Sequence, residues 1–282
     1  IPNSLLFKLE ECINEYEEHI IEKWKDKPMV FQALKSYQLV KDMNPDHYLY
    51  LKEMVVNNLN IPSNNQEQIL VGLLTYLYLL NKKNPEINCT EKEFEIYKIL
   101  VDRNLIFYHG KILPIVFYNI IHVAKDLGYI VWAEQFLLTY KDKLPEEHKF
   151  HITEACWATI DFSQKNFIKA IEHFENLKNA RSYMYNIQVR QREIRAYYEI
   201  ADFRLESALQ SLKVMISRSD KHALDLRYRN KIFVNLLLRL INIAPYKKEK
   251  LEQLKIEIKD SDTNCQGWLI KKVDEKLKQS TS

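Results

Sequence analysis

Apolar side chains recur three and four residues apart along nearly the whole chain, which is helical spacing rather than the alternation of a strand. Proline marks helix starts, most clearly at Asn44-Pro45-Asp46. Thr90 and Glu93 have the spacing of a capping box, in which each side chain binds the other's backbone N–H. Together these signals predict helices over residues 4–25, 29–42, 46–59, 66–81, 91–107 and 112–126. The short connections predict antiparallel neighbours.

One apolar pattern recurs in the second half of the chain at an interval of about 37 or 38 residues, a period typical of helical solenoids. Its copies are Ile130, Ala133, Glu134, Leu137 and Tyr140, then Phe167, Ala170, Ile171, Phe174 and Leu177, then Leu205, Ala208, Leu209, Leu212 and Met215. Each copy would form one stripe on a helix. The helix before each stripe agrees as well, with Ile121, Ala158 and Ala196 at matching offsets.

The repeat resembles the tetratricopeptide repeat, whose second helix has a small residue followed four positions later by a large apolar one. The matching pairs are Ala133 with Leu137, Ala170 with Phe174, and Ala208 with Leu212. Gly128-Tyr129 stands where that family often turns between its two helices. The resemblance covers residues 112–216 and departs from the family in lacking the close-packing glycine of the first helix. It implies an α-α superhelix, a solenoid of antiparallel helical hairpins.

Composition supports the all-α class, because 46 % of residues are hydrophobic and only four are glycine and eight proline. Three parts are expected. Residues 1–110 would form helical hairpins continuous with the solenoid, and residues 111–260 would carry the tetratricopeptide-like repeats. Residues 261–282 would form a terminal capping helix, with Trp268, Leu269, Val273 and Leu277 on one face.

Catalytic and cofactor-binding patterns are missing from the sequence. The four glycines are isolated from one another, which excludes a standard phosphate-binding loop. His148, His151 and Glu154, spaced three residues apart, come nearest to a metal or catalytic cluster, but they do not share one helix face well. We therefore predict a protein that is not an enzyme, with no cofactor and no metal site.

Compartment and membrane association follow from two further features. Cys12, Cys89, Cys156 and Cys265 are far apart, which predicts buried free cysteines and a reducing, cytoplasmic location. The longest apolar run, residues 69–80, is too short to cross a membrane, so no membrane partner is expected.

The resemblance implies a concave surface lined by the first helix of each repeat. The expected partner-binding residues are Tyr118, Asn119, His122 and Lys125 from the first repeat, Thr159 from the second, and Arg190, Glu193 and Tyr197 from the third. Tyrosine would supply rigid apolar area and arginine or lysine would fix an acidic group. The expected partner is another protein, a peptide, or a missing domain of the same chain. The sequence starts at Ile1-Pro2 rather than at Met, which predicts that the chain is processed or is a fragment.

Two other roles stay open. Residues 181–231 contain eleven Lys and Arg against six Asp and Glu, a local charge of +5 in a chain whose net charge is +3. Arginines are interleaved with tyrosines there, so this face could bind nucleic acid through phosphate contacts and base stacking. The third role is purely architectural, as a linker or a self-association module.

Overall fold

The computed structural model describes residues 35, 38–39, 41, 43–57, 61–84, 86–177, 183–218, 224–263 and 265–279. The predicted helix over residues 4–25 and most of the one over residues 29–42 lie outside the described residues. The chain divides into two compact units, Ile1–Ile152 and Thr153–Ser282. The three-part division at residues 110 and 260 stays a prediction.

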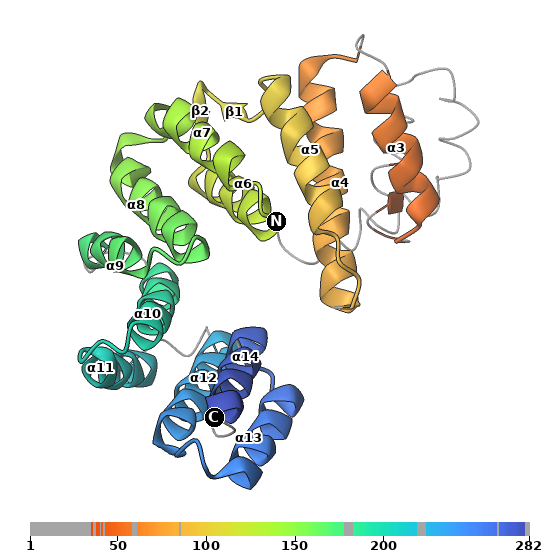
Figure 1. Ribbon diagram of the computed structural model, residues 1–282. Coiled ribbons are helices and arrows are strands. Elements are labelled where there is room, and N and C mark those ends of the chain that lie inside the picture. The colour runs from red at the N-terminus through yellow and green to blue at the C-terminus, as the bar shows by residue number, and fades with distance from the viewer. Residues whose placement is uncertain are drawn as a thin grey trace. The chain divides into compact units, whose positions relative to one another are not determined.

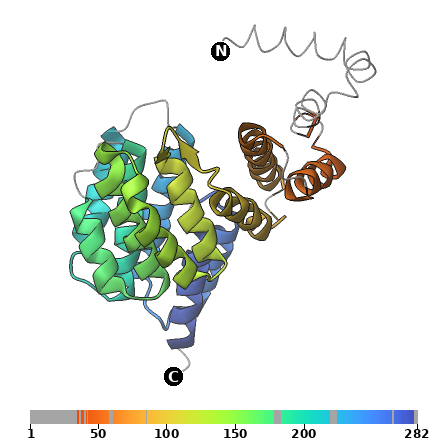
Figure 2. The ribbon, with the colours of Figure 1, turned by 90° about the horizontal axis from the view of Figure 1, so that it is seen from above.

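The first unit is a series of helices in which each contacts the next from α3 through α7 (Figures 1 and 2). Its elements are α3 (Pro45–Asn57), α4 (Ser63–Lys83), α5 (Thr90–Asp102), β1 (Phe107–Tyr108), β2 (Lys111–Ile112), α6 (Pro114–Asp126), α7 (Ile130–Tyr140) and the 3-10 turn η1 (Lys141–Lys143). Helix α8 (Glu146–Ser163) contains the boundary between the units.

The second unit continues with helices that again contact their successors, from α9 through α14. They are α9 (Phe167–Asn176), α10 (Tyr183–Glu199), α11 (Leu205–Arg218), α12 (Leu224–Asn242), α13 (Lys248–Asp260) and α14 (Gln266–Gln279). Helix α14 also contacts α12. The all-α class is therefore confirmed for the part of the chain that the structure describes.

A small β-hairpin interrupts the helices where the sequence predicted none. Helix α5 ends at Asp102 instead of residue 107, and Phe107 then pairs with Ile112 in an antiparallel ladder. The turn residues His109 and Gly110 have φ values of 50° and 76°. Two consecutive positive φ values fit a type I′ turn, whose twist matches that of paired strands. The prediction that helix continues to residue 107 is wrong.

Helix starts agree with the sequence at one site and differ at another. Helix α3 begins at Pro45, and the Asn44 side-chain oxygen accepts a hydrogen bond from the Asp46 N–H at 2.9 Å. Helix α5 begins at Thr90 itself, with no side-chain capping bond. The Thr90 N–H instead donates to the Asn88 side chain at 3.0 Å. The predicted capping box is wrong, because Thr90 lies one residue too far inside the helix.

Helices α6, α8 and α10 end with one geometry, which the end of α5 shares: Asn104 has a φ of 55° and the Leu105 N–H donates to the Leu100 carbonyl at 2.8 Å. The second residue after the last helical one has a positive φ at Gly128 (78°), Lys165 (64°) and Ala201 (51°). The next N–H donates to a carbonyl five residues back, in the pairs Tyr129 to Ala124 at 2.9 Å, Asn166 to Asp161 at 2.8 Å, and Asp202 to Tyr197 at 2.9 Å. This is the Schellman motif, which satisfies the last helical carbonyls. It ends α6, α8 and α10 alike.

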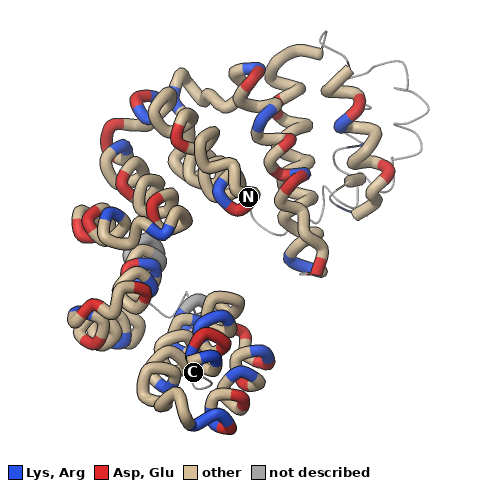
Figure 3. Tube along the Cα trace, viewed as in Figure 1, with Lys and Arg blue, Asp and Glu red and all other residues tan. Residues whose placement is uncertain are grey.

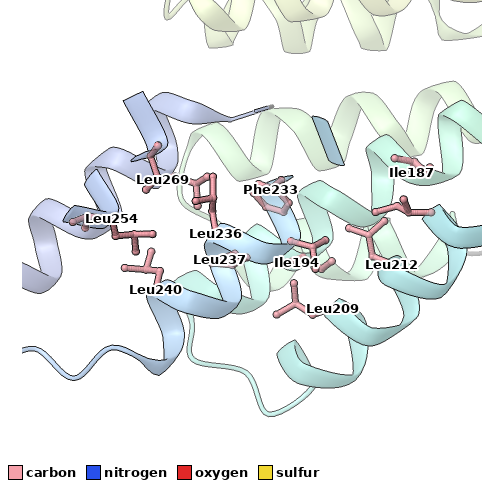
Figure 4. Close-up of a cluster of buried hydrophobic side chains, with 14 of the residues drawn as sticks. Ile187, Ile194, Leu209, Leu212, Phe233, Leu236, Leu237, Leu240, Leu254 and Leu269 are labelled. Atoms are coloured by element: carbon pink, nitrogen blue, oxygen red, sulfur yellow. The ribbon is translucent and has the colours of Figure 1, made fainter. Parts of the chain in front are cut away.

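One apolar cluster joins α10, α11, α12, α13 and α14 of the second unit (Figure 4). Ile194 of α10, Leu212 of α11 and Phe233 of α12 are fully buried in it. Leu269 and Val273 of α14 are also fully buried there, and Trp268 and Leu277 pack against the cluster. The predicted apolar face of the last helix therefore faces the core.

The residues of the sequence repeat are mostly buried. Ile121, Ala158 and Ala196, which hold matching positions in the first helix of each repeat, are each 0 % exposed. Ala133 and Ala170 of the stripes are equally buried, whereas Ala208 is half-buried. Small side chains at such positions allow helices to approach closely.

Replacing Ala170 by leucine should lower the free energy of unfolding by about 1–3 kcal/mol, because the added methylenes overpack a site with no free surface. Thermal unfolding followed by circular dichroism measures the change. Lys169→Leu, at the exposed neighbouring position on α9, is the control and should change stability by about 0.5 kcal/mol or less. Equal effects from the two variants would show that Ala170 is not closely packed.

Candidate functional site

Three aromatic side chains meet at the surface of the first unit, between α5 and α7. The Phe94 ring centroid lies 4.9 Å from that of Tyr129 and 5.0 Å from that of Trp132, the latter edge to face. Behind them Trp132 stacks on Phe136 at 5.5 Å, and the Phe136 side chain is 3 % exposed. The surface aromatics are thus held by a buried aromatic layer, which limits their motion.

The turn between α6 and α7 positions two of these rings. Gly128 takes the left-handed conformation that few other residues tolerate, and its motif sends the chain back along α6. Tyr129 follows directly, and Trp132 lies three residues later on the first turn of α7. Phe94 comes from the neighbouring α5, since α5 packs on α6 and α6 on α7. Helix α5, the turn between α6 and α7, and α7 itself thus supply one ring each.

These rings line a recess with a volume of about 580 Å³. We call it the aromatic recess; its lining is Phe94, Lys98, Gly128, Tyr129, Ile130, Val131, Trp132 and Gln135. Tyr129 is 50 % exposed and Val131 is 68 % exposed. Lys98 and Gln135 add two flexible polar side chains, both exposed. A volume of this size falls within the range of ligand-binding pockets.

Charge is sparse around the aromatic recess. Lys98 is the one charged side chain among the described residues of its lining, and Glu134 is the one charged residue of α7. Figure 3 shows acidic and basic positions scattered over the helices. Near the Phe94 end, burial and then the negative charge of Asp126 raise the pKa of Glu93. Apolar contact and neutral hydrogen bonding therefore dominate what the recess can offer.

The four predicted partner-binding residues of the first repeat lie on α6 and do not line the recess. Tyr118 packs its ring 4.4 Å from that of His122. Asn119 forms a side-chain hydrogen bond with Tyr97, whose hydroxyl pKa is nevertheless raised, chiefly by burial. Lys125 forms an ion pair with Asp126. These side chains contact residues of their own unit.

Two of the predicted partner-binding residues on α10 are buried. Glu193 is 1 % exposed and Tyr197 is 3 % exposed. Glu193 accepts a hydrogen bond from the Tyr197 hydroxyl at 2.9 Å and pairs with Arg190 at 2.7 Å. Burial, and then the negative charge of Glu193, raise the pKa of Tyr197. The expectation that these two side chains line an open groove is wrong, because they satisfy each other inside the unit.

Thr159, expected on the same surface, is 4 % exposed, and its hydroxyl donates to the Ala155 carbonyl at 2.8 Å. It is likewise a core residue.

Arginines of the basic segment also make internal contacts. The Arg195 guanidinium lies 4.7 Å from the Phe162 ring and 5.3 Å from the Trp268 ring, and it donates to Cys265 Sγ at 3.3 Å. Arg204 binds Asp202 through Nε at 2.9 Å and through a terminal nitrogen at 2.7 Å. Arg181, and the side chains of Tyr183 and Tyr185, lie outside the described residues. A continuous arginine and tyrosine surface is therefore absent among the described side chains of α10.

A second cavity, of about 330 Å³, lies between α11 and α12. Its apolar side is formed by Ile216, Tyr228 and Val234, and its polar side includes Lys213, Arg227 and Lys231. We call it the cationic cleft. The sequence predicted excess positive charge over residues 181–231 but did not place it here, since the two helices are brought together only by the shared core.

Glu154, the acidic member of the predicted histidine cluster, contacts two side chains of α9. Glu154 accepts a hydrogen bond from Asn176 at 2.6 Å and contacts His173 Nδ1 at 3.1 Å. No group of three or more His, Cys, Asp or Glu suited to a metal ion occurs among the described residues.

Cys89 and Cys156 are free and buried, and burial raises the pKa of the Cys156 thiol. Cys265 is free and half-buried, and Cys12 lies outside the described residues.

Comparison with known proteins adds no family. No protein-family model, curated protein or solved structure matches the chain. Among the described residues, no helix has the length and apolar character needed to cross a membrane.

Proposed function

We propose that this protein is a non-enzymatic binding scaffold that takes an extended segment of a partner protein in the aromatic recess. The observation that carries the proposal is the set of three rings, Phe94, Tyr129 and Trp132, gathered at 4.9–5.0 Å around an open cavity. Tyrosine and tryptophan dominate binding energy at protein interfaces, because they bury large apolar area at a low cost in side-chain entropy.

The polar side chains of the recess suit a peptide backbone. Lys98 and Gln135 can donate hydrogen bonds to carbonyl groups, while the rings contact apolar or proline side chains. Aromatic-lined grooves bind extended, proline-rich segments in this way, since such segments lose little entropy when bound. With one cation in its lining, the recess fits a segment of low net charge. The proposal includes no reaction and no cofactor.

We also propose that the hairpins are tetratricopeptide-like and stack as a solenoid. The supporting observation is the shared turn geometry at Gly128, Lys165 and Ala201, which are 37 and 36 residues apart. A repeated turn at that interval, with small buried residues at matching positions, is what stacked hairpins require.

A reducing, cytoplasmic location remains part of the proposal and is supported by the free, buried Cys89 and Cys156.

The nucleic-acid alternative has less support from the geometry. Arg190 is paired with Glu193 and Arg195 lies over two aromatic rings, so neither presents a free guanidinium to a phosphate. Tyr197 is buried and cannot stack on a base.

The test is selection from a random peptide library on the immobilised protein, followed by affinity measurement of the enriched peptides. Tyr129→Ala should weaken binding at least about tenfold, the loss of a contact worth more than 1 kcal/mol. Tyr78→Ala is the matched control, since Tyr78 is also on the first unit, is 62 % exposed and lies outside the recess lining. Its affinity should stay within about twofold of the wild type.

Two results would count against the proposal. One is that no peptide is enriched over a blank surface. The other is that the enriched peptides bind Tyr129→Ala and Tyr78→Ala equally well, which would place their site elsewhere.

A further inference from the structure

The cationic cleft combines an apolar floor with positive charge from two helices. Ile216 is 6 % exposed and Val234 is 2 % exposed, so they form the floor, while Tyr228 is 62 % exposed at the edge. Lys213 of α11 and Lys231 of α12 are both exposed. Arg227 also lines the cleft, and no carboxylate occurs among the described residues of the lining.

Several cations of the second unit are paired with a carboxylate, and the two lysines of the cleft are not. Arg229 pairs with Asp262 at 3.0 Å and Lys255 pairs with Asp274 at 2.7 Å. Neither Lys213 nor Lys231 forms an ion pair within the residues that the structure describes. Uncompensated like charges around one cavity repel each other and attract an anionic ligand.

We propose that the cationic cleft binds an acidic peptide that carries one apolar anchor residue. The floor provides room for one large apolar side chain, because the cavity volume of about 330 Å³ is near the lower limit for ligand pockets. Carboxylates on either side of the anchor would reach Lys213 and Lys231. Charge complementarity of this kind fixes the register of a peptide and speeds its association.

A nucleic acid fits the cleft less well. Phosphates would satisfy the lysines, but the floor is aliphatic, and Tyr228 is the one aromatic side chain among the described residues of the lining. Binding of single strands without sequence preference relies on several stacking rings. The inference is independent of the aromatic recess, which lies in the other unit and has different chemistry.

The experiment measures fluorescence anisotropy of a labelled short peptide with one phenylalanine between runs of glutamate, titrated with the full chain. We expect saturable binding that weakens as salt is added, because screening reduces contacts between exposed charges. The Lys213→Glu, Lys231→Glu double variant should bind at least about tenfold more weakly. The double variant Lys250→Glu, Lys271→Glu is the control, with the same charge change at exposed positions of α13 and α14.

Two control peptides separate the parts of the proposal. Replacing the glutamates by glutamine should abolish binding, and replacing the phenylalanine by alanine should weaken it about fivefold or more. The proposal is overturned if the wild-type chain fails to bind the acidic peptide, or if both double variants weaken it equally. It is also overturned if the phenylalanine is dispensable, or if a labelled oligothymidylate binds the cleft more tightly than the peptide. Tyr129→Ala should leave this binding unchanged, so failure here and failure of the recess proposal are distinguishable.

Discussion

Replacing Phe233 by alanine is expected to lower the free energy of unfolding by about 3–5 kcal/mol, the range for deleting a fully buried aromatic side chain. Phe233 is 0 % exposed and belongs to the cluster that joins α10, α11, α12, α13 and α14. Figure 4 shows its ring among Ile194, Leu212 and Leu236. The Trp268 ring centroid of α14 lies 6.3 Å away. The cavity left by alanine would therefore touch several helices.

Urea denaturation followed by circular dichroism measures this loss. Tyr246→Ala is the matched control, because Tyr246 is an aromatic residue of the same unit that is 76 % exposed. It should change the free energy of unfolding by about 0.5 kcal/mol or less. If the two variants are equally stable, the cluster around Phe233 does not hold the second unit together.

Lys272→Met is expected to cost about 3 kcal/mol, because it removes the cation from a buried ion network. The Lys272 side chain is 7 % exposed, and its Nζ lies 2.6 Å from Glu199 and 2.7 Å from Glu275. Burial alone would lower the pKa of this ammonium, but hydrogen bonds to the two carboxylates outweigh it and the pKa is raised. Glu199 is 14 % exposed and also accepts a bond from Trp268 at 2.7 Å. Without Lys272 its charge would be poorly compensated.

A double-mutant cycle with Glu199→Gln tests this interpretation. The double variant should recover at least about 1 kcal/mol relative to the sum of the single changes, since the neutral amide does not need the cation. Lys255→Met is the control: its partner Asp274 is at 2.7 Å, but the two side chains are 25 % and 40 % exposed. It should cost about 1 kcal/mol or less. A loss from Lys272→Met no greater than that of the control would contradict a buried network.

The sequence predicted helices well where the apolar pattern is long and a proline marks the start. The predicted ranges 46–59, 66–81 and 112–126 correspond to Pro45–Asn57, Ser63–Lys83 and Pro114–Asp126. The hairpin at residues 107–112 was missed because two-residue strands are too short to show alternation. Its one local signal in the sequence is Gly110, because a two-residue turn needs the positive φ that the structure shows at His109 and Gly110.

The partner-binding residues were harder to predict, because helical periodicity gives the face of a residue but not what covers that face. Glu193 and Tyr197 look like an exposed polar pair in the sequence, yet they bind each other in the core. The aromatic recess joins Phe94 with Tyr129 and Trp132, some 35 positions later in the chain, and no local pattern links them. Of the recess lining, only the turn at Gly128-Tyr129 and the stripe residue Ile130 had stood out in the sequence.

The central claim is that the aromatic recess holds a partner peptide, and the indole signals of the protein test it directly. The chain has four tryptophans; of the three that the structure describes, Trp132 alone lines the recess, and Trp24 lies outside the described residues. In a spectrum of tryptophan-labelled protein, with Trp132→Phe used to assign its Nε1–H resonance, the selected peptide should shift the Trp132 signal in a saturable way. The signals of Trp157 and Trp268 should stay in place. A Trp132 resonance that does not move at saturating peptide would contradict the account.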